Sequence, residues 1–319
     1  MIISRTPFRI SYIGGGTDLS NFYREHYGAV VSTTIDKYIY LSMHPFFNDN
    51  GYHLKYSQNE VVNKIDDIKH SIIREVFKEY NITGVDFNST SDVPSGTGLG
   101  SSSTFTTGLI NLCSSYNKIF IKKEEIAKKA CDVEIRRLGA PVGKQDQYAA
   151  AIGGLNYIQF NPDESVLVEK ICLSQEKLTQ LNNSLLLFYL GGVRDSASVL
   201  KEQQKKIPLN IGILKRMANL AEELRDELKG NSIDNFGRIL HEGWMYKKEL
   251  ASNVTNGAVD YWYKKARDNG AEGGKLLGAG GSGFLLVYAS ERKEVLSAAM
   301  RLYELPFKFE DSGTTIIYA

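Results

Sequence analysis

Three glycine-rich clusters constrain this chain more than any other feature of its sequence. The first is Gly14–Gly16, followed by Thr17 and Asp18; the second is Ser95–Ser103; the third is Gly273–Gly283. Glycine has no Cβ, so its backbone adopts conformations and close approaches that other residues resist. Each cluster is therefore expected where the backbone turns sharply, touches another backbone or binds a ligand.

Length and charge limit the classes of protein that the chain can belong to. Its 319 residues are enough for roughly two domains of ~150 residues, with cores that need no disulfide or metal. The net charge of +1 excludes a strongly basic nucleic-acid-binding protein and a strongly acidic chain. The average composition excludes collagen, a coiled coil and wholesale disorder.

The cysteines and the apolar segments indicate a reducing, aqueous compartment. Three cysteines, an odd number, lack the spacing of a metal site: Cys113, Cys131 and Cys172. The first residues contain no apolar stretch typical of an export signal. The longest apolar runs, Leu185–Leu190 and Phe284–Ala289, fall far short of the ~20 residues of a membrane span. We therefore expect a cytoplasmic, soluble protein with no membrane partner.

Hydrophobic periodicity predicts a mixed chain whose pattern changes near residue 180. Strands are expected at Ile10–Ile13, Ala29–Met43, Val85–Ser89, Ser184–Leu190 and Phe284–Ala289. Helices are expected at Ile65–Tyr80, Thr104–Asn117, Lys122–Leu138, Leu209–Lys229 with Pro208 at its start, a segment from about Ser232, and Glu291–Tyr303, with a closing hairpin around Asp311–Gly313. We accordingly expect two domains, residues 1–180 and 181–319.

Ser95–Ser103 has the composition of a phosphate-binding loop. Its glycines let the backbone approach an anion, and its serines open a predicted helix whose first N–H groups face the ligand. A Rossmann cradle is disfavoured because the segment follows Pro94, far from the first strand, and no Walker A pattern occurs in the chain. A di- or triphosphate is the expected ligand; a plain serine N-cap is the alternative.

Glu134 is the first of two carboxylates with chemical implications. Helical spacing places it on the same face as Ala127, Cys131 and Leu138, which is otherwise apolar. A buried carboxylate must be paired, protonated or bound to a metal. A salt bridge to an arginine is one outcome. Beside a nucleotide, the other is Mg²⁺, which prefers hard oxygen ligands.

Asp146 is the second carboxylate, in the segment Gly139–Gln147. It follows a stiff loop bounded by glycines, where it could cap the next short helix. It could equally accept a proton from a substrate hydroxyl or orient that hydroxyl, and Lys144 nearby would help to keep it ionised. The sequence alone leaves both interpretations open.

The segments around the first and third glycine clusters each allow a structural and a functional interpretation. Arg5, Arg9 and Asp18 flank a predicted strand, where they are either solvated charges or, for Asp18, a partner for polyol hydroxyls. Gly278–Gly283 leaves room for a ligand or for another backbone to pass against it.

Several other chemistries lack support in the sequence. The five histidines have no zinc spacing, and no G-x-S-x-G elbow of a serine hydrolase occurs. Basic stretches such as Lys201–Lys206 are most simply solvated helix faces, so no nucleic-acid partner is expected.

Taken in chain order, the three clusters resemble the motifs of the GHMP kinases, a family that includes galactokinase and the homoserine, mevalonate and phosphomevalonate kinases. The matching residues are Pro7 and Arg9 with Gly14 and Asp18, then Pro94-x-x-x-Gly98-Leu99-x-Ser101-Ser102, then Leu277–Gly283. Gly143–Gln147 resembles the segment that carries the family's catalytic aspartate.

This resemblance implies an α+β fold of two domains, with ATP and a sugar meeting in the cleft between them. It implies that residues 1–180 bind nucleotide and Mg²⁺ and that residues 181–319 complete the sugar site. The implied catalytic residues are Asp146 as the base, Arg9 and Lys144, and the implied Mg²⁺ ligands are Ser102 and Glu134. The implied nucleotide-binding residues are Pro94, Ser95, Gly96, Thr97, Gly98, Leu99, Gly100, Ser101, Ser102 and Ser103, and the implied sugar-binding residues are Asp18, Thr17, Gly15, Gly16, Gly280 and Gly281.

Within the family the chain is similar to the D-glycero-D-manno-heptose 7-phosphate kinases, through residues 7–18, 141–147 and 241–248. This similarity implies phosphorylation of an anomeric hydroxyl, for the synthesis of a nucleotide-activated heptose. Galactokinases carry Glu and His at the positions of Gly15 and Gly16, so a roomier pocket for a larger or phosphorylated sugar is expected here. Candidates to bind the distal phosphate are Lys144, Arg194 and Lys275.

Two alternatives stay open at this point. One is a kinase for another acceptor, such as fucose, an N-acetylhexosamine or mevalonate. The other is a sensor that binds sugar and ATP without turnover, which the presence of Asp146, Ser102 and Glu134 disfavours. The sequence does not choose between a monomer and a homodimer.

Overall fold

A computed structural model of the chain describes residues 1–47, 51–192 and 196–319, so that Arg194 lies outside the described residues. The strands of the first sheet are β1 (Ile2–Ile13), β2 (Gly28–Pro45), β3 (Tyr52–Lys55), β4 (Asn59–Val62), β5 (Val85–Ser91), β6 (Asn156–Phe160), β7 (Val166–Lys170), β12 (Phe309–Glu310) and β13 (Thr315–Tyr318). The second sheet contains β8 (Leu185–Tyr189), β9 (Gly273–Leu276), β10 (Phe284–Tyr288) and β11 (Tyr303–Glu304). The predicted mixed fold is confirmed.

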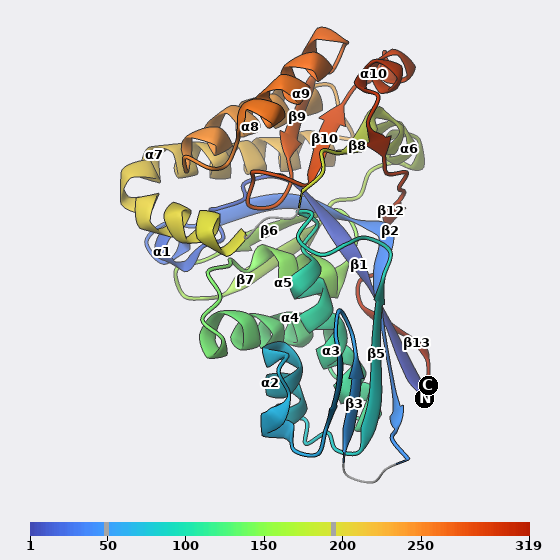
Figure 1. Cartoon of the computed structure of the whole chain (residues 1–319). Helices are drawn as coiled ribbons and strands as arrows, with labels where there is room; N and C mark the ends of the chain where they lie inside the picture. The colour runs from blue at the N-terminus through green and yellow to red at the C-terminus, as the bar shows by residue number, and fades with distance from the viewer. Residues whose placement is uncertain (48–50, 193–195) are drawn as a thin grey trace.

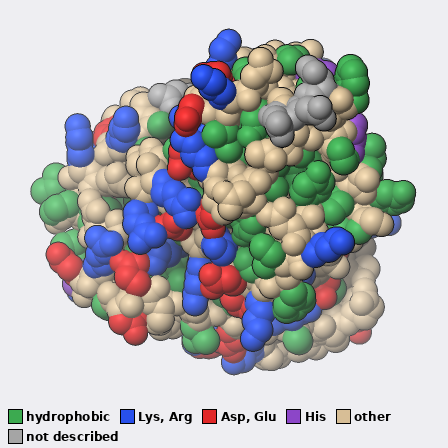
Figure 2. Space-filling view, turned by 90° about the horizontal axis from the view of Figure 1, so that it is seen from below, with side chains coloured by type: hydrophobic (Ala, Val, Ile, Leu, Met, Phe, Trp, Pro, Cys, Tyr) green, Lys and Arg blue, Asp and Glu red, His purple; other side chains and the backbone are tan. Residues whose placement is uncertain are grey.

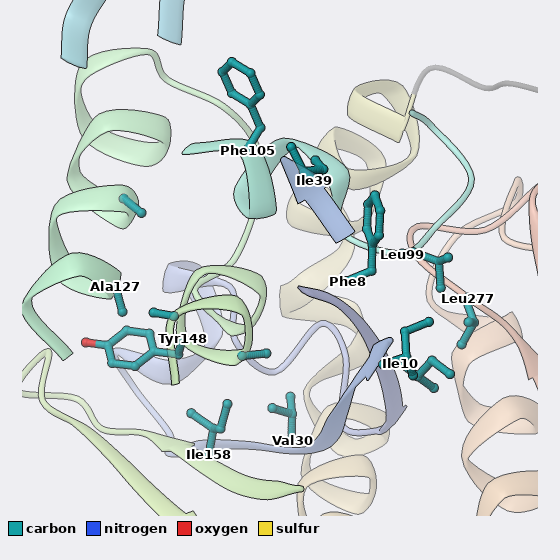
Figure 3. Close-up of a cluster of buried hydrophobic side chains, with 14 of the residues drawn as sticks. Phe8, Ile10, Val30, Ile39, Leu99, Phe105, Ala127, Tyr148, Ile158 and Leu277 are labelled. Carbon is teal, nitrogen blue, oxygen red and sulfur yellow. The ribbon is translucent and has the colours of Figure 1, made fainter. Parts of the chain in front are cut away.

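The first sheet is organised around a long antiparallel pair, β1 and β2. Its strand order is β13-β1-β2-β5-β3-β4, with β6 and β12 also paired to β2 and β7 paired to β6. Four helices belong to this half: α2 (Ser71–Glu79), α3 (Ser101–Tyr116), α4 (Lys123–Cys131) and α5 (Gln145–Ile152). Of these, α3 and α5 pack on β1 and β2 (Figure 1). Buried side chains from the strands and helices meet there, among them Phe8, Ile10, Val30, Ile39, Leu99, Phe105 and Tyr148 (Figure 3).

The second sheet has the order β11-β8-β10-β9 and carries the remaining long helices. They are α6 (Gln175–Ser184), α7 (Ser196–Lys229), α8 (Phe236–Glu249), α9 (Gly257–Asp268) and α10 (Lys293–Met300), whereas the short α1 (Ser20–Tyr23) follows β1. Helix α8 contacts both β9 and β1, and α7 contacts β2. These contacts join the two halves, and Figure 1 shows α7, α8 and α9 lying across the end of the first sheet.

Several predicted elements have different limits in the structure. The helix expected at Ile65–Tyr80 is a 3₁₀ turn (Ile65–Asp67) and then α2, because Ile68 adopts an extended conformation. The helix expected from Leu209 begins at Ser196, with Pro208 inside it. The expected closing hairpin is wrong. Its two strands, β12 and β13, pair with β2 and β1 and not with each other.

The chain passes from the first sheet to the second through α6, close to the predicted boundary at residue 180. The last residues depart from a simple division, because β12 and β13 return to the first sheet and place both termini side by side (Figure 1). The two-domain division at this boundary therefore stays a prediction.

The surface carries charges of both signs. Figure 2 shows Lys and Arg side chains interspersed with Asp and Glu over the face seen from below. Among the described helices, none is long and apolar enough to cross a membrane.

Candidate active site

The N-terminus of α3 is an uncapped helix end. Its N-cap is Gly100, whose φ of 82° lies in the left-handed region, and no side chain caps the helix. The first N–H groups of a helix have no partner within the helix, and the helix dipole makes this end attractive to anions. The serine N-cap that was the alternative for Ser95–Ser103 is therefore wrong, and the segment keeps the features of a phosphate site.

The second glycine cluster is held by β1, β10 and the third glycine cluster through backbone contacts. The Arg9 N–H donates to the Leu99 carbonyl at 3.2 Å, and the Phe284 N–H donates to the Thr97 carbonyl at 3.1 Å. A Cβ added to Gly98 would lie 2.7 Å from the Leu277 oxygen. Leu99 and Leu277 lie next to each other near Ile10 in Figure 3. The third cluster therefore packs closely against the backbone of the second cluster, which is one of the two roles predicted for it.

A cavity of about 820 Å³ opens beside this segment. Its lining contains most of the predicted nucleotide-binding residues: Pro94, Ser95, Gly96, Gly98, Gly100, Ser101, Ser102 and Ser103. Thr97 and Leu99 are not among them, since the Thr97 hydroxyl donates to the Pro94 carbonyl and Leu99 is in the core. The cavity continues past Tyr56, His70 and Phe105, which the sequence analysis did not assign.

Glu134 lies behind the cavity wall on a distorted helix and contacts Ser102 of the cavity lining. The helix predicted to Leu138 changes at Cys131 into a π-helical turn, Asp132–Arg137, a geometry that often occurs at functional sites. The Glu134 side chain is buried; it accepts from the Ser102 hydroxyl at 2.6 Å and from the Gln147 amide at 2.7 Å. Burial raises the pKa of Glu134, and the charge of Asp146 acts in the same direction.

The predicted arginine salt bridge of Glu134 does not form within the described residues. A buried carboxylate without a cationic partner, next to a hydroxyl and a phosphate-type loop, supplies the hard oxygens that Mg²⁺ prefers. No described group of three or more His, Cys, Asp or Glu side chains could hold a metal by itself. A cation here would therefore need oxygen atoms from a bound phosphate as well as Ser102 and Glu134.

Asp146 pairs with Arg9 in a two-pronged ion pair. The guanidinium Nε and one terminal nitrogen each donate to a carboxylate oxygen at 2.7 Å, and the other terminal nitrogen donates to the Gly98 carbonyl at 2.7 Å. Arg9 is 4% exposed. The paired contacts fix the direction of the Asp146 carboxylate, and the third contact of Arg9 ties it to the phosphate segment.

Lys144 is not where the sequence analysis expected it. Its ammonium pairs with Glu164 and lies 4.5 Å from the centre of the Tyr23 ring. It lines neither this cavity nor the neighbouring one. The ion-pair partner of Asp146 is Arg9, whereas that of Lys144 is Glu164.

A second, narrower cavity of about 80 Å³ adjoins the first, and Arg9 and Asp146 line both. Asp18, Gly15 and Gly16 line the narrow one, as predicted for acceptor-binding residues. Asp18 is buried, which raises its pKa, and it accepts hydrogen bonds from the Gly16 N–H at 3.0 Å and the Gln145 N–H at 3.2 Å.

Three other predicted sugar-binding residues lie elsewhere. The Thr17 hydroxyl donates to the Gly14 and Ala29 carbonyls, so it secures the turn. Gly280 lines the larger cavity, and the Gly281 N–H donates to the Val254 carbonyl at 2.9 Å. The structure thus assigns these three to the walls around the site.

The sequence analysis missed several side chains of the narrow cavity: Ser11, Gln145, Gln203 and Lys247. Lys247 lies in a segment that we had identified as similar to one branch of the family, but no role was given to it. Its position three residues after the buried Trp244, on the inward face of α8, is the signal that could have found it.

Comparison with known proteins gives consistent matches over the whole chain. Residues 67–154 match the GHMP kinases N terminal domain, and residues 220–304 match the GHMP kinases C terminal domain. The chain is 29% identical to D-glycero-alpha-D-manno-heptose 7-phosphate kinase of Campylobacter jejuni, over 98% of this chain and 97% of that protein. It is 27% identical to galactokinase of Pyrococcus furiosus, over 97% and 95%.

A solved structure shares the fold along its full length. It is a D-glycero-D-manno-heptose 1-phosphate kinase from Bacteroides thetaiotaomicron, with a TM-score of 0.83, 24% identity and complete coverage of both chains.

Proposed function

Because the chain belongs to the GHMP kinases and is an ATP-dependent carbohydrate kinase, we propose that its acceptor is D-glycero-D-manno-heptose 7-phosphate. The γ-phosphoryl group of ATP would pass to the anomeric hydroxyl and give the 1,7-bisphosphate and ADP. One observation carries the assignment of the reacting centre. Arg9 and Asp146 are shared by the wide cavity beside the phosphate segment and the narrow cavity beside Asp18.

The donor binds in the wide cavity. The uncapped N–H groups of α3 and the backbone of Ser95–Gly100 face the β- and γ-phosphates, and the helix dipole adds to the attraction. Phosphoryl transfer depends chiefly on positioning and charge neutralisation, which this rigid backbone supplies.

Ser102 and Glu134 are the residues that would hold Mg²⁺. Their hydroxyl and carboxylate oxygens are 2.6 Å apart, and Gln147 orients the second carboxylate oxygen. When bound, the cation neutralises charge on the transferring phosphoryl group. Without it, burial favours the protonated form of Glu134.

Asp146 accepts the proton of the attacking hydroxyl or orients its oxygen. The Arg9 guanidinium contacts both carboxylate oxygens, which fixes their direction. Because Arg9 also donates to the Gly98 carbonyl, it fixes the position of the Asp146 carboxylate relative to the phosphate segment.

The acceptor assignment is supported by the pocket and by the relative from Campylobacter jejuni. Gly15 and Gly16 line the narrow cavity, and a Cβ added to either would already be in van der Waals contact, at 3.6 and 3.4 Å, so the cavity keeps volume that the larger side chains of galactokinases would fill. The galactokinase match leaves a free hexose as the competing acceptor.

A coupled assay for ADP release tests the proposal. The purified chain is offered a panel of free sugars, hexose phosphates and heptose phosphates at equal concentration. We expect the highest kcat/KM with D-glycero-D-manno-heptose 7-phosphate and phosphorus NMR of the product to show a new anomeric phosphate. A higher kcat/KM with an unphosphorylated sugar would contradict the acceptor, and no ADP release with any sugar would contradict the proposed transfer.

A further inference from the structure

Two buried lysines, Lys247 and Lys275, lie at the narrow cavity and form no ion pair with its carboxylates, Asp18 and Asp146. The Lys247 ammonium donates to the carbonyls of Leu276 at 2.9 Å and Gly278 at 2.5 Å, and the Lys275 ammonium donates to the Tyr12 carbonyl at 2.9 Å. They are 5% and 3% exposed. Within the described residues neither ammonium has an ion pair. Carbonyl hydrogen bonds leave the positive charge of a buried ammonium without a counterion, so an anion bound here would stabilise the protonated forms of both lysines.

A third donor lies at the same cavity. Gln203 of α7 is 6% exposed, and its amide nitrogen has no hydrogen-bond partner in the described structure. Buried polar groups are nearly always satisfied in a functional complex, so this amide is available to a ligand atom. The three side chains come from α7, α8 and β9, and all three are donors.

We infer that Lys247, Lys275 and Gln203 bind the phosphate group that the acceptor already carries. This inference rests on the proposed function, since it names the part of the chain that distinguishes a phosphorylated from a free sugar. The Lys247 ammonium has one N–H left after its two carbonyl contacts, and the Lys275 ammonium has two. With the Gln203 amide, these groups match the acceptor oxygens of a phosphate monoester.

A second phosphate group to consider is the γ-phosphoryl group that is transferred from ATP. The residues that line each cavity distinguish it from the phosphate that the acceptor already carries. Lys247, Lys275 and Gln203 line the narrow cavity beside Asp18 and do not line the wide cavity beside the phosphate segment. Arg9, by contrast, lines both. The donors therefore belong to the acceptor side.

Two other predicted candidates for this phosphate are less suitable. Lys144 is paired with Glu164 and lines neither cavity, and Arg194 is outside the described residues. Lys275 was the third candidate, and the structure adds Lys247 and Gln203 to it.

The test compares two acceptors that differ only in the phosphate, the heptose 7-phosphate and the free heptose, in Lys275→Met and Gln203→Leu. We expect Lys275→Met to raise KM for the phosphorylated acceptor by about 10- to 100-fold, and Gln203→Leu by about tenfold, with KM for ATP unchanged. The preference for the phosphorylated acceptor should fall in proportion. Lys248→Met is the matched control, because Lys248 is next to Lys247 on α8 but lies 3.8 Å from Asp260 and outside the cavity lining.

The outcomes separate the inference from the proposed function. If the wild-type chain prefers the phosphorylated acceptor and both variants keep that preference, the inference is wrong and the function stands. An equal fall of kcat with both acceptors would assign the lysines to the transferring phosphoryl group and overturn the inference.

If the wild-type chain phosphorylates neither acceptor, the proposed function fails. Calorimetric titration of the heptose 7-phosphate then tests the subsite directly. Weaker binding to Lys275→Met than to Lys248→Met would support the inference, and equal binding would contradict it. Thermal melting checks that each variant is folded, and loss of a buried charge gives no reason to expect unfolding.

Discussion

The nucleotide side and the acceptor side of this site are built from different parts of the chain. The nucleotide side consists mainly of backbone from one continuous segment, Ser95–Ser103, supported by the backbone of Leu277 and Gly278. The acceptor side consists of single side chains from several elements: Asp18, Gln145, Gln203, Lys247 and Lys275. A site made of backbone should fail when atoms are added to it, whereas a site made of side chains should fail when their functional groups are removed.

The largest effect is expected at the residue that both sides share. Asp146→Asn keeps the size of the side chain but removes the negative charge that Arg9 holds and the capacity to accept a proton. We expect kcat to fall by about 10²- to 10⁴-fold, with KM for ATP little changed. Steady-state kinetics and a thermal melt check this. A variant that keeps most of its turnover would show that Asp146 is neither base nor orienting group.

The next effect concerns Glu134, the buried carboxylate beside the nucleotide segment. Glu134→Gln keeps hydrogen-bonding capacity toward Ser102 but removes the carboxylate charge. We expect the Mg²⁺ concentration for half-maximal activity to rise by about 10- to 100-fold. A titration of Mg²⁺ at fixed ATP measures it, and Glu169→Gln, whose carboxylate pairs with Lys229 and lines neither cavity, is the control. An unchanged Mg²⁺ requirement would contradict the proposed ligand.

The backbone character of the nucleotide side is tested by adding one methyl group. Gly98 has a φ of 92°, and a Cβ there would meet the Leu277 oxygen at 2.7 Å. We expect Gly98→Ala to raise KM for ATP by about tenfold or more, because the segment must shift as well as adopt an unfavourable φ. Gly139→Ala is the matched control, since Gly139 also has a positive φ, 64°, but nothing lies within 4 Å of its added Cβ. Equal effects of the two substitutions would mean that the contact with Leu277 is unimportant.

This contrast also explains what the sequence could predict. A backbone site requires several glycines close together in the sequence, so Ser95–Ser103 and Gly278–Gly283 were visible as clusters. Glu134 was predicted correctly as buried, because its neighbours at helical spacing are apolar. The π-helical turn that carries Glu134 was not predicted. The hydrophobic periodicity of the segment does not distinguish a π-helical turn, which contains an extra residue, from a regular α-helix.

The residues of the acceptor side were harder to predict from the sequence, for a physical reason. Gln203 and Lys247 are ordinary polar residues on amphipathic helices, and they become buried only where α7 packs on β2 and α8 and where α8 packs on β9. Lys144 was misassigned for the complementary reason. Nearness to Asp146 in sequence does not bring the side chains together, because Lys144 turns toward Glu164. Local sequence likewise did not reveal the partners of β12 and β13, because these strands pair with β2 and β1 from the other end of the chain.

A pH dependence should distinguish the two sides. Burial lowers the pKa of Lys247 to about 7; the charge of Arg9 acts in the same direction and that of Asp146 against it. Lys247 is protonated below this pKa and loses its charge above it. KM for the phosphorylated acceptor should therefore rise several-fold, on the order of five, from pH 7 to pH 9, where the acceptor phosphate is already a dianion. KM for ATP should change less.

Lys247→Met should flatten this profile, and Lys248→Met should leave it as in the wild type. A rise in the acceptor KM that persists in Lys247→Met would assign the titration to another group, of which Lys275 is the nearest candidate, since burial and the charge of Lys247 lower its pKa as well.

The smallest effect is expected at Lys144, which the sequence placed in the catalytic group and the structure does not. Its ammonium is paired with Glu164, whose side chain is 45% exposed, and it lies over the Tyr23 ring. Such a pair contributes at most about 1 kcal/mol to stability. We expect Lys144→Met to change kcat and both KM values by no more than about twofold, and Glu164→Gln to behave in the same way. A large fall of kcat in Lys144→Met alone would require its ammonium to leave Glu164 and reach Asp146 when substrates bind. The acceptor side would then be completed only when substrates bind, whereas the backbone of the nucleotide side is already in place without them.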